Sequence, residues 1–259
     1  MKVVLFCGGL GTRLRDYDEN IPKPMVTVGA RPIIWNLMRY YAHYGHKEFV
    51  LCLGHKSEVI KKYFLQYDEC MSNDFELSEG ARKVLLLNND IAEWRITFAD
   101  TGANSEIGER LRRVRPYLTD DDVFLANYAD CLSDLPLPAF IGEFMSKTQV
   151  AAFVTVPPNT SFHYVSVENG LVTDVTDIAK TRLRVNGGFF IFRKKIFDYL
   201  EEGKDLVADA FPRLIKERQL AAYGYDGFWK AMDTFKDKVE LDKLVAKGNP
   251  PWEIWRRKR

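Results

Sequence analysis

The first half of the chain alternates short runs of apolar residues with stretches whose apolar residues recur at helical spacing. Residues 2–6, 48–53 and 123–126 form the apolar runs, and residues 32–43 and 57–65 carry the helical spacing. Runs this short and continuous are typical of strands buried on both faces of a parallel sheet. The repeated alternation of strand and helix therefore predicts an α/β fold, with a mostly parallel, mixed, Rossmann-like sheet flanked by helices.

The later segments extend this pattern and interrupt it once. We expect a helix over 138–146, a strand over 150–156 and a final amphipathic helix that begins near Asp237. Residues 71–97 run polar, apolar and polar again. This stretch indicates a small excursion from the sheet, either a hairpin or a contact within a homo-oligomer.

Charge and hydropathy exclude several classes of function. Lys and Arg total 37 against 36 Asp and Glu, a formal net charge of +1. Nonspecific binding to nucleic-acid phosphates needs a basic excess. No apolar run reaches the roughly 18 residues of a membrane-spanning helix, and the N-terminal apolar run leads into glycines, unlike a signal peptide. We therefore expect no nucleic-acid partner and no membrane.

The four cysteines, Cys7, Cys52, Cys70 and Cys131, show no CxxC spacing, and with only 4 His they form no zinc pattern. Cys7 and Cys52 lie inside apolar runs, where a small buried thiol is usual. This usage favours a reduced, cytoplasmic compartment.

A glycine-rich loop follows the first predicted strand. Gly8, Gly9 and Gly11 let the backbone approach a ligand closely and point N–H groups at an anion. Arg13 adds donors suited to phosphate oxygens, and Lys23 lies between two prolines that fix its backbone. A glycine turn with a surface lysine is the simpler interpretation, but together these features favour a polyphosphate site. Ligands of such sheets bind beyond the carboxyl ends of the strands, where this loop lies.

Two separated aspartates each lie near the end of a predicted strand. Asp130 follows the run 123–126, and Asp233 lies within residues 227–234. Mg²⁺ prefers one or two carboxylates together with waters and phosphate oxygens, so this pair beside a polyphosphate site indicates a magnesium site. The alternatives are a turn residue at either position and a helix cap at Asp233, because a helix begins just after it.

The motifs at residues 8–14, 22–25, 186–190 and 227–234 resemble those of the sugar-phosphate nucleotidyltransferases. The resemblance runs nearly from end to end and is strongest to the branch that transfers cytidylyl groups to glucose 1-phosphate. It implies the family's GT-A-like fold and a role in polysaccharide biosynthesis.

The resemblance also implies a mechanism. CTP would lie over the glycine loop, and a phosphate oxygen of the second substrate would attack the α-phosphorus without a covalent protein intermediate. Arg13 and Lys23 would be catalytic, acting on the departing pyrophosphate and the phosphoryl centre, while Asp130 and Asp233 would hold Mg²⁺. The positions implied to contact the nucleotide are Leu5, Phe6, Cys7, Gly8, Gly9, Gly11, Thr12, Arg13, Lys23, Ser105, Arg110 and Asp130.

Arg110 has a second interpretation as an arginine on the surface of a helix. Arg112, Arg113 and Arg115 follow it closely, as in a basic helix face.

Departures from the family cluster in the half of the chain that would bind the acceptor. The family's Gly-Asp-Gly is here Ala129-Asp130-Cys131, which keeps the carboxylate and crowds the backbone. The family's phosphate-binding lysine is replaced by Asp177. Strand alternation would place Lys180, Arg182 and Arg184 on one face, where they either supply the lost charge or form an exposed basic face. The implied acceptor-binding residues are His163, Tyr164, Asp177, Lys180, Arg182, Arg184, Asn186, Gly187 and Gly188.

We expect one domain over residues 1–259, with a nucleotide-binding half over about 1–130, an acceptor-binding half over about 131–236 and a C-terminal helix and tail over 237–259. The leading hypothesis is transfer of a cytidylyl group from CTP to a phosphorylated small molecule, by default a sugar 1-phosphate such as glucose 1-phosphate. A non-glucose phosphorylated acceptor is the second hypothesis, and a non-catalytic, nucleotide-binding regulatory paralogue is the third.

Overall fold

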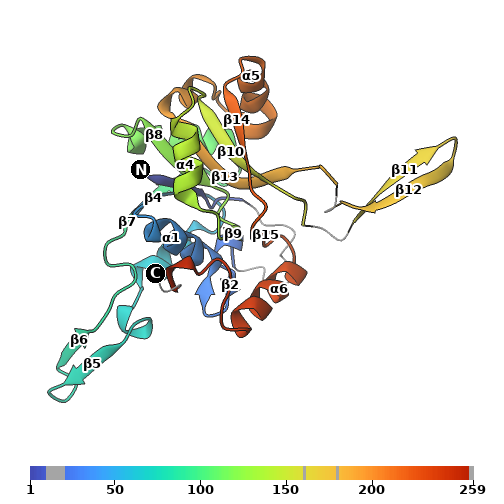
Figure 1. The fold of residues 1–259 in the computed structure, drawn as a ribbon. Helices are drawn as coiled ribbons and strands as arrows, with labels where there is room; N and C mark the ends of the chain where they lie inside the picture. The colour runs from blue at the N-terminus through green and yellow to red at the C-terminus, as the bar shows by residue number, and fades with distance from the viewer. Residues whose placement is uncertain (10–20, 160–161, 179–180, 257–259) are drawn as a thin grey trace.

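A seven-stranded sheet in the order β14-β10-β13-β8-β1-β4-β7 forms the centre of the computed structural model (Figure 1). The structure describes residues 1–9, 21–159, 162–178 and 181–256. The sheet strands are β1 (Val3–Phe6), β4 (Glu48–Leu53), β7 (Arg95–Asp100), β8 (Val123–Asn127), β10 (Ala151–Val156), β13 (Val185–Arg193) and β14 (Leu220–Gly224).

The sheet is mostly parallel, with one reversed strand. β1 pairs in parallel with β4 and with β8, β4 pairs in parallel with β7, and β10 pairs in parallel with β14. β13 runs antiparallel to both of its neighbours, β8 and β10. The predicted mixed, mostly parallel sheet is therefore confirmed, and its carboxyl edge gathers the loops after β1, β4, β7 and β8.

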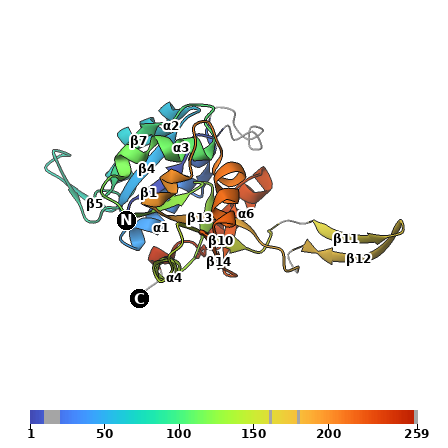
Figure 2. The same cartoon turned by 90° about the horizontal axis from the view of Figure 1, so that it is seen from above.

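Helices cover both faces of the sheet, as Figures 1 and 2 show. Val3 and Leu5 of β1 belong to one hydrophobic cluster and Val4 and Phe6 to the other, because successive strand residues point to opposite faces. The first cluster includes residues of α1, α2, α4 and α6, and the second includes residues of α3 and α5. The helices are α1 (Ile33–His43), α2 (Ser57–Leu65), α3 (Ile107–Arg113), α4 (Leu137–Met145), α5 (Phe211–Lys216) and α6 (Phe235–Ala246).

Two hairpins extend from the body in Figures 1 and 2. One joins β5 (Phe75–Ser78) to β6 (Lys83–Leu86), and the other joins β11 (His163–Glu168) to β12 (Leu171–Asp177). The excursion predicted over 71–97 is thus a hairpin, but its C-terminal boundary is wrong because β7 returns to the sheet at Arg95. Both hairpins expose large apolar side chains: Phe75, Leu77, Val84, Leu85 and Leu86 on the first, and Tyr164, Val165, Val167, Leu171, Val172 and Val175 on the second.

The C-terminal segment packs onto the body. α6 begins earlier than predicted, because Thr234 caps it in a capping box with Asp237. Trp252 is 1 % exposed and its indole N–H donates to the Asn36 side chain. Two further short strand pairs complete the fold, β2 (Thr27–Val28) with β3 (Arg31–Pro32) and β9 (Cys131–Ser133) with β15 (Trp229–Ala231). Among the described residues, no helix is long and apolar enough to cross a bilayer.

Candidate active site

The glycine loop begins at the buried end of β1. The side chains of Leu5, Phe6 and Cys7 are at most 4 % exposed, so only their backbone groups are available to a ligand. Burial is the largest cause that raises the pKa of the Cys7 thiol well above its usual value, which keeps it neutral. Gly8 and Gly9 continue from this strand, while the predicted Gly11, Thr12 and Arg13 lie outside the described residues.

Arg110 holds the start of this loop by donating a hydrogen bond to the Gly8 carbonyl. It lies on α3 and is 2 % exposed, so the interpretation as a helix-surface arginine is wrong. Its guanidinium lies at the carboxyl edge, where it meets the loops that follow β1, β4 and β7. It donates to the carbonyl oxygens of Leu53, Gly102, Gly8 and Ala103 and to the hydroxyl of Thr101 at 2.8–3.3 Å.

Two glycines make room for this guanidinium. A Cβ on Gly8 would lie 2.0 Å from Arg110 Nη1, and one on Gly54 would lie 2.7 Å from the same atom. Both positions therefore exclude a side chain while Arg110 is in place. Ser105 lies nearby, half-buried, and its hydroxyl donates to the carbonyl of Thr101 within the same loop.

Lys23 joins the two predicted metal ligands directly. Its Nζ lies 2.6 Å from Asp130 Oδ2 and 2.6 Å from Asp233 Oδ1. Lys23 opens a short 3-10 turn over Lys23–Met25, with Pro22 before it and Pro24 inside it, so the predicted restraint by prolines is confirmed. The three side chains are 16 %, 23 % and 42 % exposed, in the order Lys23, Asp130, Asp233, so solvent and ligands reach them from one side.

The ammonium is stabilised by the carboxylates it bridges. Burial alone would lower the pKa of Lys23, but the charges and hydrogen bonds of Asp130 and Asp233 outweigh it and raise that pKa. Burial is also the largest cause that raises the pKa of Asp130, and the nearby Asp233 charge adds to it, although Lys23 opposes both. The two carboxylates together need a cation, which Lys23 supplies here.

A short strand pair brings the two aspartates together from 103 positions apart in the chain. β9 and β15 are antiparallel, with Cys131 opposite Ala231, and the Met232 N–H donates to the Asp130 carbonyl at 2.9 Å. Asp233, the residue after Met232, is therefore held close to Asp130. The cap interpretation of Asp233 is wrong, since Thr234 is the N-cap of α6.

Ala129 adopts a left-handed backbone, with φ of 64°. Non-glycine residues rarely adopt this conformation because Cβ approaches the carbonyl oxygen. The departure from the resembling motif therefore costs backbone strain at Ala129. The side-chain oxygen of Asn127 accepts from the Ala129 N–H at 3.0 Å and steadies this turn beside Asp130.

The expected acceptor residues Asn186, Gly187 and Gly188 lie at the start of β13, close to this centre. The Asn186 amide donates to the Tyr128 hydroxyl at 3.2 Å and accepts from the Gly188 N–H at 2.9 Å. The Gly187 carbonyl accepts from the indole N–H of Trp229 at 2.7 Å. These bonds link the first residues of β13 to the segments that carry Asp130 and Asp233.

The predicted basic strand face does not form at Arg182 and Arg184. β13 begins at Val185, so Arg182 and Arg184 precede it in irregular structure, and Lys180 lies outside the described residues. Arg184 donates to Thr155, to the Tyr225 carbonyl and to Asp226. The prediction from strand alternation failed because β13 starts at Val185, one residue after Arg184.

His163, Tyr164 and Asp177 lie on the exposed β11–β12 hairpin. His163 pairs with Asp177 at the base of the hairpin, and Tyr164 is 50 % exposed. The sequence interpretation grouped them with Asn186, but in the structure they belong to a separate, protruding element (Figure 1).

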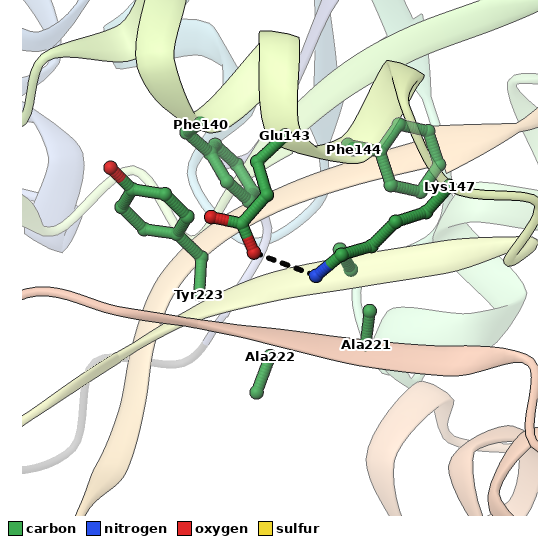
Figure 3. A pocket seen from close by; sticks show the side chains of 8 residues that line it. Phe140, Glu143, Phe144, Lys147, Ala221, Ala222 and Tyr223 are labelled. Atoms are coloured by element: carbon green, nitrogen blue, oxygen red, sulfur yellow. Dashed lines mark hydrogen bonds and ion pairs between the residues drawn. The ribbon is translucent and has the colours of Figure 1, made fainter.

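A cavity of about 690 Å³ opens beside Asp233 and Asn186. Trp229, Lys230 and Lys236 line it, and sequence analysis missed all three. Their position in the motif over 227–234 was the available signal for the first two. By contrast, the crevice in Figure 3, between α4 and the sheet edge, has about 10 Å³ for solvent, room for one water at most. It is lined by Phe140, Glu143, Phe144, Lys147, Ala152, Ala221, Ala222 and Tyr223.

The carboxylate pair fits a hard divalent cation. Two oxygen-donor side chains already converge on one cationic atom, and Mg²⁺ completes its shell with waters and substrate phosphates. Across the residues that the structure describes, no cluster of three or more His, Cys, Asp or Glu could hold a metal without such help.

Comparison with known proteins gives a consistent result. A family model described as "Nucleotidyl transferase" matches residues 2–247. The chain is 35 % identical over 257 residues to a "Probable glucose-1-phosphate cytidylyltransferase" of Bacillus subtilis, covering 98 % of this chain and 100 % of that protein. It is 35 % identical over 258 residues to the glucose-1-phosphate cytidylyltransferase of Salmonella typhi, with the same coverage.

Solved structures share the fold. A putative glucose-1-phosphate thymidylyltransferase from Bacillus anthracis superposes with a TM-score of 0.67 at 15 % identity, covering 95 % of each chain. An apo UDP-glucose pyrophosphorylase gives a TM-score of 0.68 at 16 % identity, covering 96 % of this chain and 99 % of that one.

Proposed function

The chain belongs to the nucleotidyl transferase family, and we propose that it transfers a cytidylyl group from CTP to a sugar 1-phosphate and releases pyrophosphate. The observation that carries this proposal is the full-length similarity, at 35 % identity, to glucose-1-phosphate cytidylyltransferases. The Lys23–Asp130–Asp233 centre adds the chemistry that such a transfer needs.

The reaction is an in-line displacement at phosphorus. A phosphate oxygen of the sugar 1-phosphate forms a bond to the α-phosphorus of CTP, and the bond from that phosphorus to the oxygen bridging to the β-phosphate breaks. Pyrophosphate leaves with the electron pair. No protein nucleophile is required, so the protein contributes positioning and charge stabilisation.

We assign Asp130 and Asp233 to Mg²⁺, which supplies charge neutralisation at the phosphates when it is bound. Lys23 holds the two carboxylates in the ligand-free protein. With metal and nucleotide in place, its ammonium would turn from the carboxylates to the phosphoryl oxygens, where it stabilises the charge that develops in the transition state. Arg13 is assigned to the departing pyrophosphate on the family resemblance.

The nucleotide is assigned to the half of the chain over about 1–130. Backbone groups of Leu5 to Gly9, with Gly11 and Thr12, would line the phosphates, and Ser105 would lie at the nucleoside end. Arg110 would act through the carbonyls it fixes, because its donors already meet five acceptors.

The acceptor is assigned to the cavity beside Asp233 and Asn186, in the half over about 131–236. Glucose 1-phosphate is the default acceptor. A different phosphorylated acceptor is the alternative, which Asp177 favours because a carboxylate stands where the family resemblance implies a phosphate-binding lysine. A regulatory, non-catalytic paralogue is disfavoured, since Lys23, Asp130 and Asp233 converge within 2.6 Å contacts.

The test is a matrix of nucleoside triphosphates against phosphorylated acceptors, read by pyrophosphate release. We expect CTP with a sugar 1-phosphate to give the highest kcat/KM. If pyrophosphate is released only from a triphosphate other than CTP, the cytidylyl assignment is contradicted. If no acceptor in the matrix gives any pyrophosphate release, the enzyme assignment is contradicted.

We further propose a cytoplasmic homo-oligomer. The exposed apolar side chains of the two hairpins support self-association, and the four free cysteines suit a reducing compartment. Light scattering during size-exclusion chromatography tests the assembly, and replacing Leu77 and Leu85 by Ser should reduce the mass if the first hairpin is the contact.

A further inference from the structure

The turn that carries Asp233 is tied at both ends. β15 ends at Ala231, α6 begins at Phe235, and Asp233 lies between them. The backbone of so short a turn depends on how its flanking elements are connected to each other. The structure shows such a connection, made by a buried lysine that the mechanism does not use.

Lys230 of β15 is 6 % exposed. Its Nζ lies 2.6 Å from Glu240 Oε2 and 3.3 Å from Asp237 Oδ1, both on α6. Burying an ammonium is costly unless carboxylates compensate its charge. Two carboxylates on one helix do so here, which joins β15 to α6 across the turn.

Asp237 is shared between this ion pair and the turn itself. Its Oδ1 faces Lys230, while its Oδ2 accepts from the N–H of Asp233 at 3.2 Å, the N–H of Thr234 at 2.9 Å and the Thr234 hydroxyl at 2.7 Å. The position of the Asp237 carboxylate therefore determines the backbone conformation at Asp233.

We propose that Lys230 is a positioning residue for the transfer reaction: through Asp237 it holds the Asp233 carboxylate in the direction needed to meet Asp130. Lys230 is thus not the acceptor-phosphate cation that its place in the cavity wall would suggest, because two carboxylates already neutralise it. This inference rests on the proposed function, in which Asp233 binds the metal–nucleotide complex.

The same helix offers a matched control. Lys238 is 8 % exposed and pairs with Asp242 at 2.6 Å. It has the same charge, similar burial and a carboxylate partner, but that partner, Asp242, accepts from the Gly29 N–H at 2.9 Å, whereas Asp237 accepts from the turn that carries Asp233. Removing it should cost stability as removing Lys230 does, without moving Asp233.

The experiment compares the wild type, Lys230→Met and Lys238→Met by three measurements. These are the melting temperature, Mn²⁺ binding in the presence of CTP by electron paramagnetic resonance, and kcat and KM for CTP over a Mg²⁺ titration. We expect Lys230→Met to weaken Mn²⁺ binding and to lower kcat by about 10–100-fold, the range for partners of metal ligands, with KM for CTP changed by less than about threefold. Lys238→Met should lower the melting temperature alone.

Wild-type Mn²⁺ affinity in Lys230→Met overturns the proposal, as does an equal loss in Lys238→Met. If Lys230→Met does not fold, Asp237→Asn replaces it: this variant keeps an oxygen for the turn and removes the charge that faces Lys230, and unchanged Mn²⁺ affinity there overturns the proposal as well. If the wild type binds Mn²⁺ with CTP but releases no pyrophosphate, the proposed function is contradicted, while the Mn²⁺ affinities of the variants still test the role of Lys230. A wild type that binds no Mn²⁺ with CTP defeats both.

Discussion

The proposed nucleotide side and the proposed acceptor side of the molecule differ in how firmly their residues are held. On the proposed nucleotide side, Arg110 is buried and meets five acceptors at or just beyond the ends of three strands, β1, β4 and β7. On the acceptor side, His163, Tyr164 and Asp177 lie on a hairpin that leaves the body. The comparison teaches that the departures at His163, Tyr164 and Asp177 fall on an element where a substitution disturbs few contacts, whereas the departures at Ala129 and Cys131 are buried at the centre.

Removing either central carboxylate should have the largest effect. Asp130→Asn and Asp233→Asn should each lower kcat by about 10²–10³-fold or more, because each removes a carboxylate that would hold Mg²⁺ at the reacting phosphates. Pyrophosphate release measures the loss, and circular dichroism checks the fold. Asp177→Asn on the hairpin is the control, with turnover within a few-fold of wild type. An equally large loss of kcat in Asp177→Asn would contradict the expected difference between the centre and the hairpin.

Arg110→Met should come next, as a loss of stability. It removes this donor from the buried Gly8 carbonyl and from the part-buried carbonyls of Gly102 and Ala103. An unpaired buried carbonyl costs roughly 1–3 kcal/mol, so we expect a loss on the order of 2 kcal/mol or more. Arg182→Met, on the exposed segment before β13, should change the free energy of unfolding by less than about 0.5 kcal/mol. Urea denaturation of both variants gives the two values. Similar values would show that the nucleotide side is no more firmly held than the acceptor side.

Asp177→Lys should change acceptor preference. A charge-assisted hydrogen bond contributes about 1.5–3 kcal/mol, so the variant should gain roughly tenfold in kcat/KM for glucose 1-phosphate relative to the best acceptor of the wild type. The ratio of the two efficiencies is the measurement. An unchanged ratio, with efficient use of glucose 1-phosphate by the wild type, would show that the hairpin does not choose the acceptor.

The smallest expected effect concerns backbone strain. Ala129→Gly should stabilise the protein by about 1 kcal/mol, since the left-handed conformation costs alanine roughly 1–2 kcal/mol and glycine loses part of this gain to chain entropy. Asn169 has φ of 51° in the turn of the β11–β12 hairpin, where asparagine is tolerated. Asn169→Gly should therefore change the melting temperature less than Ala129→Gly, and the reverse order would contradict the assignment of strain.

Much of the fold followed from the sequence because burial leaves a plain signal. The strand predicted over 48–53 is β4 to the residue, since five of its six residues are buried and apolar. The helix over 57–65 is likewise α2. The strand expected for Arg182 and Arg184 was wrong, because a basic stretch at the surface carries no such signal.

The centre was predictable in part. Strand-end position and residue type predicted the proximity of Asp130 and Asp233 to Lys23, and the structure confirms that proximity. The network of Arg110 was not predictable, because its partners are backbone carbonyls from distant loops, which leave no mark in the sequence. Lys230 was missed for a related reason, since its partners become neighbours only once β15 and α6 are placed together.

Arg110, Gly8 and Gly54 have a consequence for how such a chain can diverge. A side chain at either glycine would collide with the guanidinium, and a smaller residue in place of the arginine would strand the carbonyls it serves. A single substitution at any of these three positions is therefore expected to destabilise the protein. The mutational freedom of the chain is therefore concentrated in places like the β11–β12 ribbon, where new specificities can be sampled one substitution at a time.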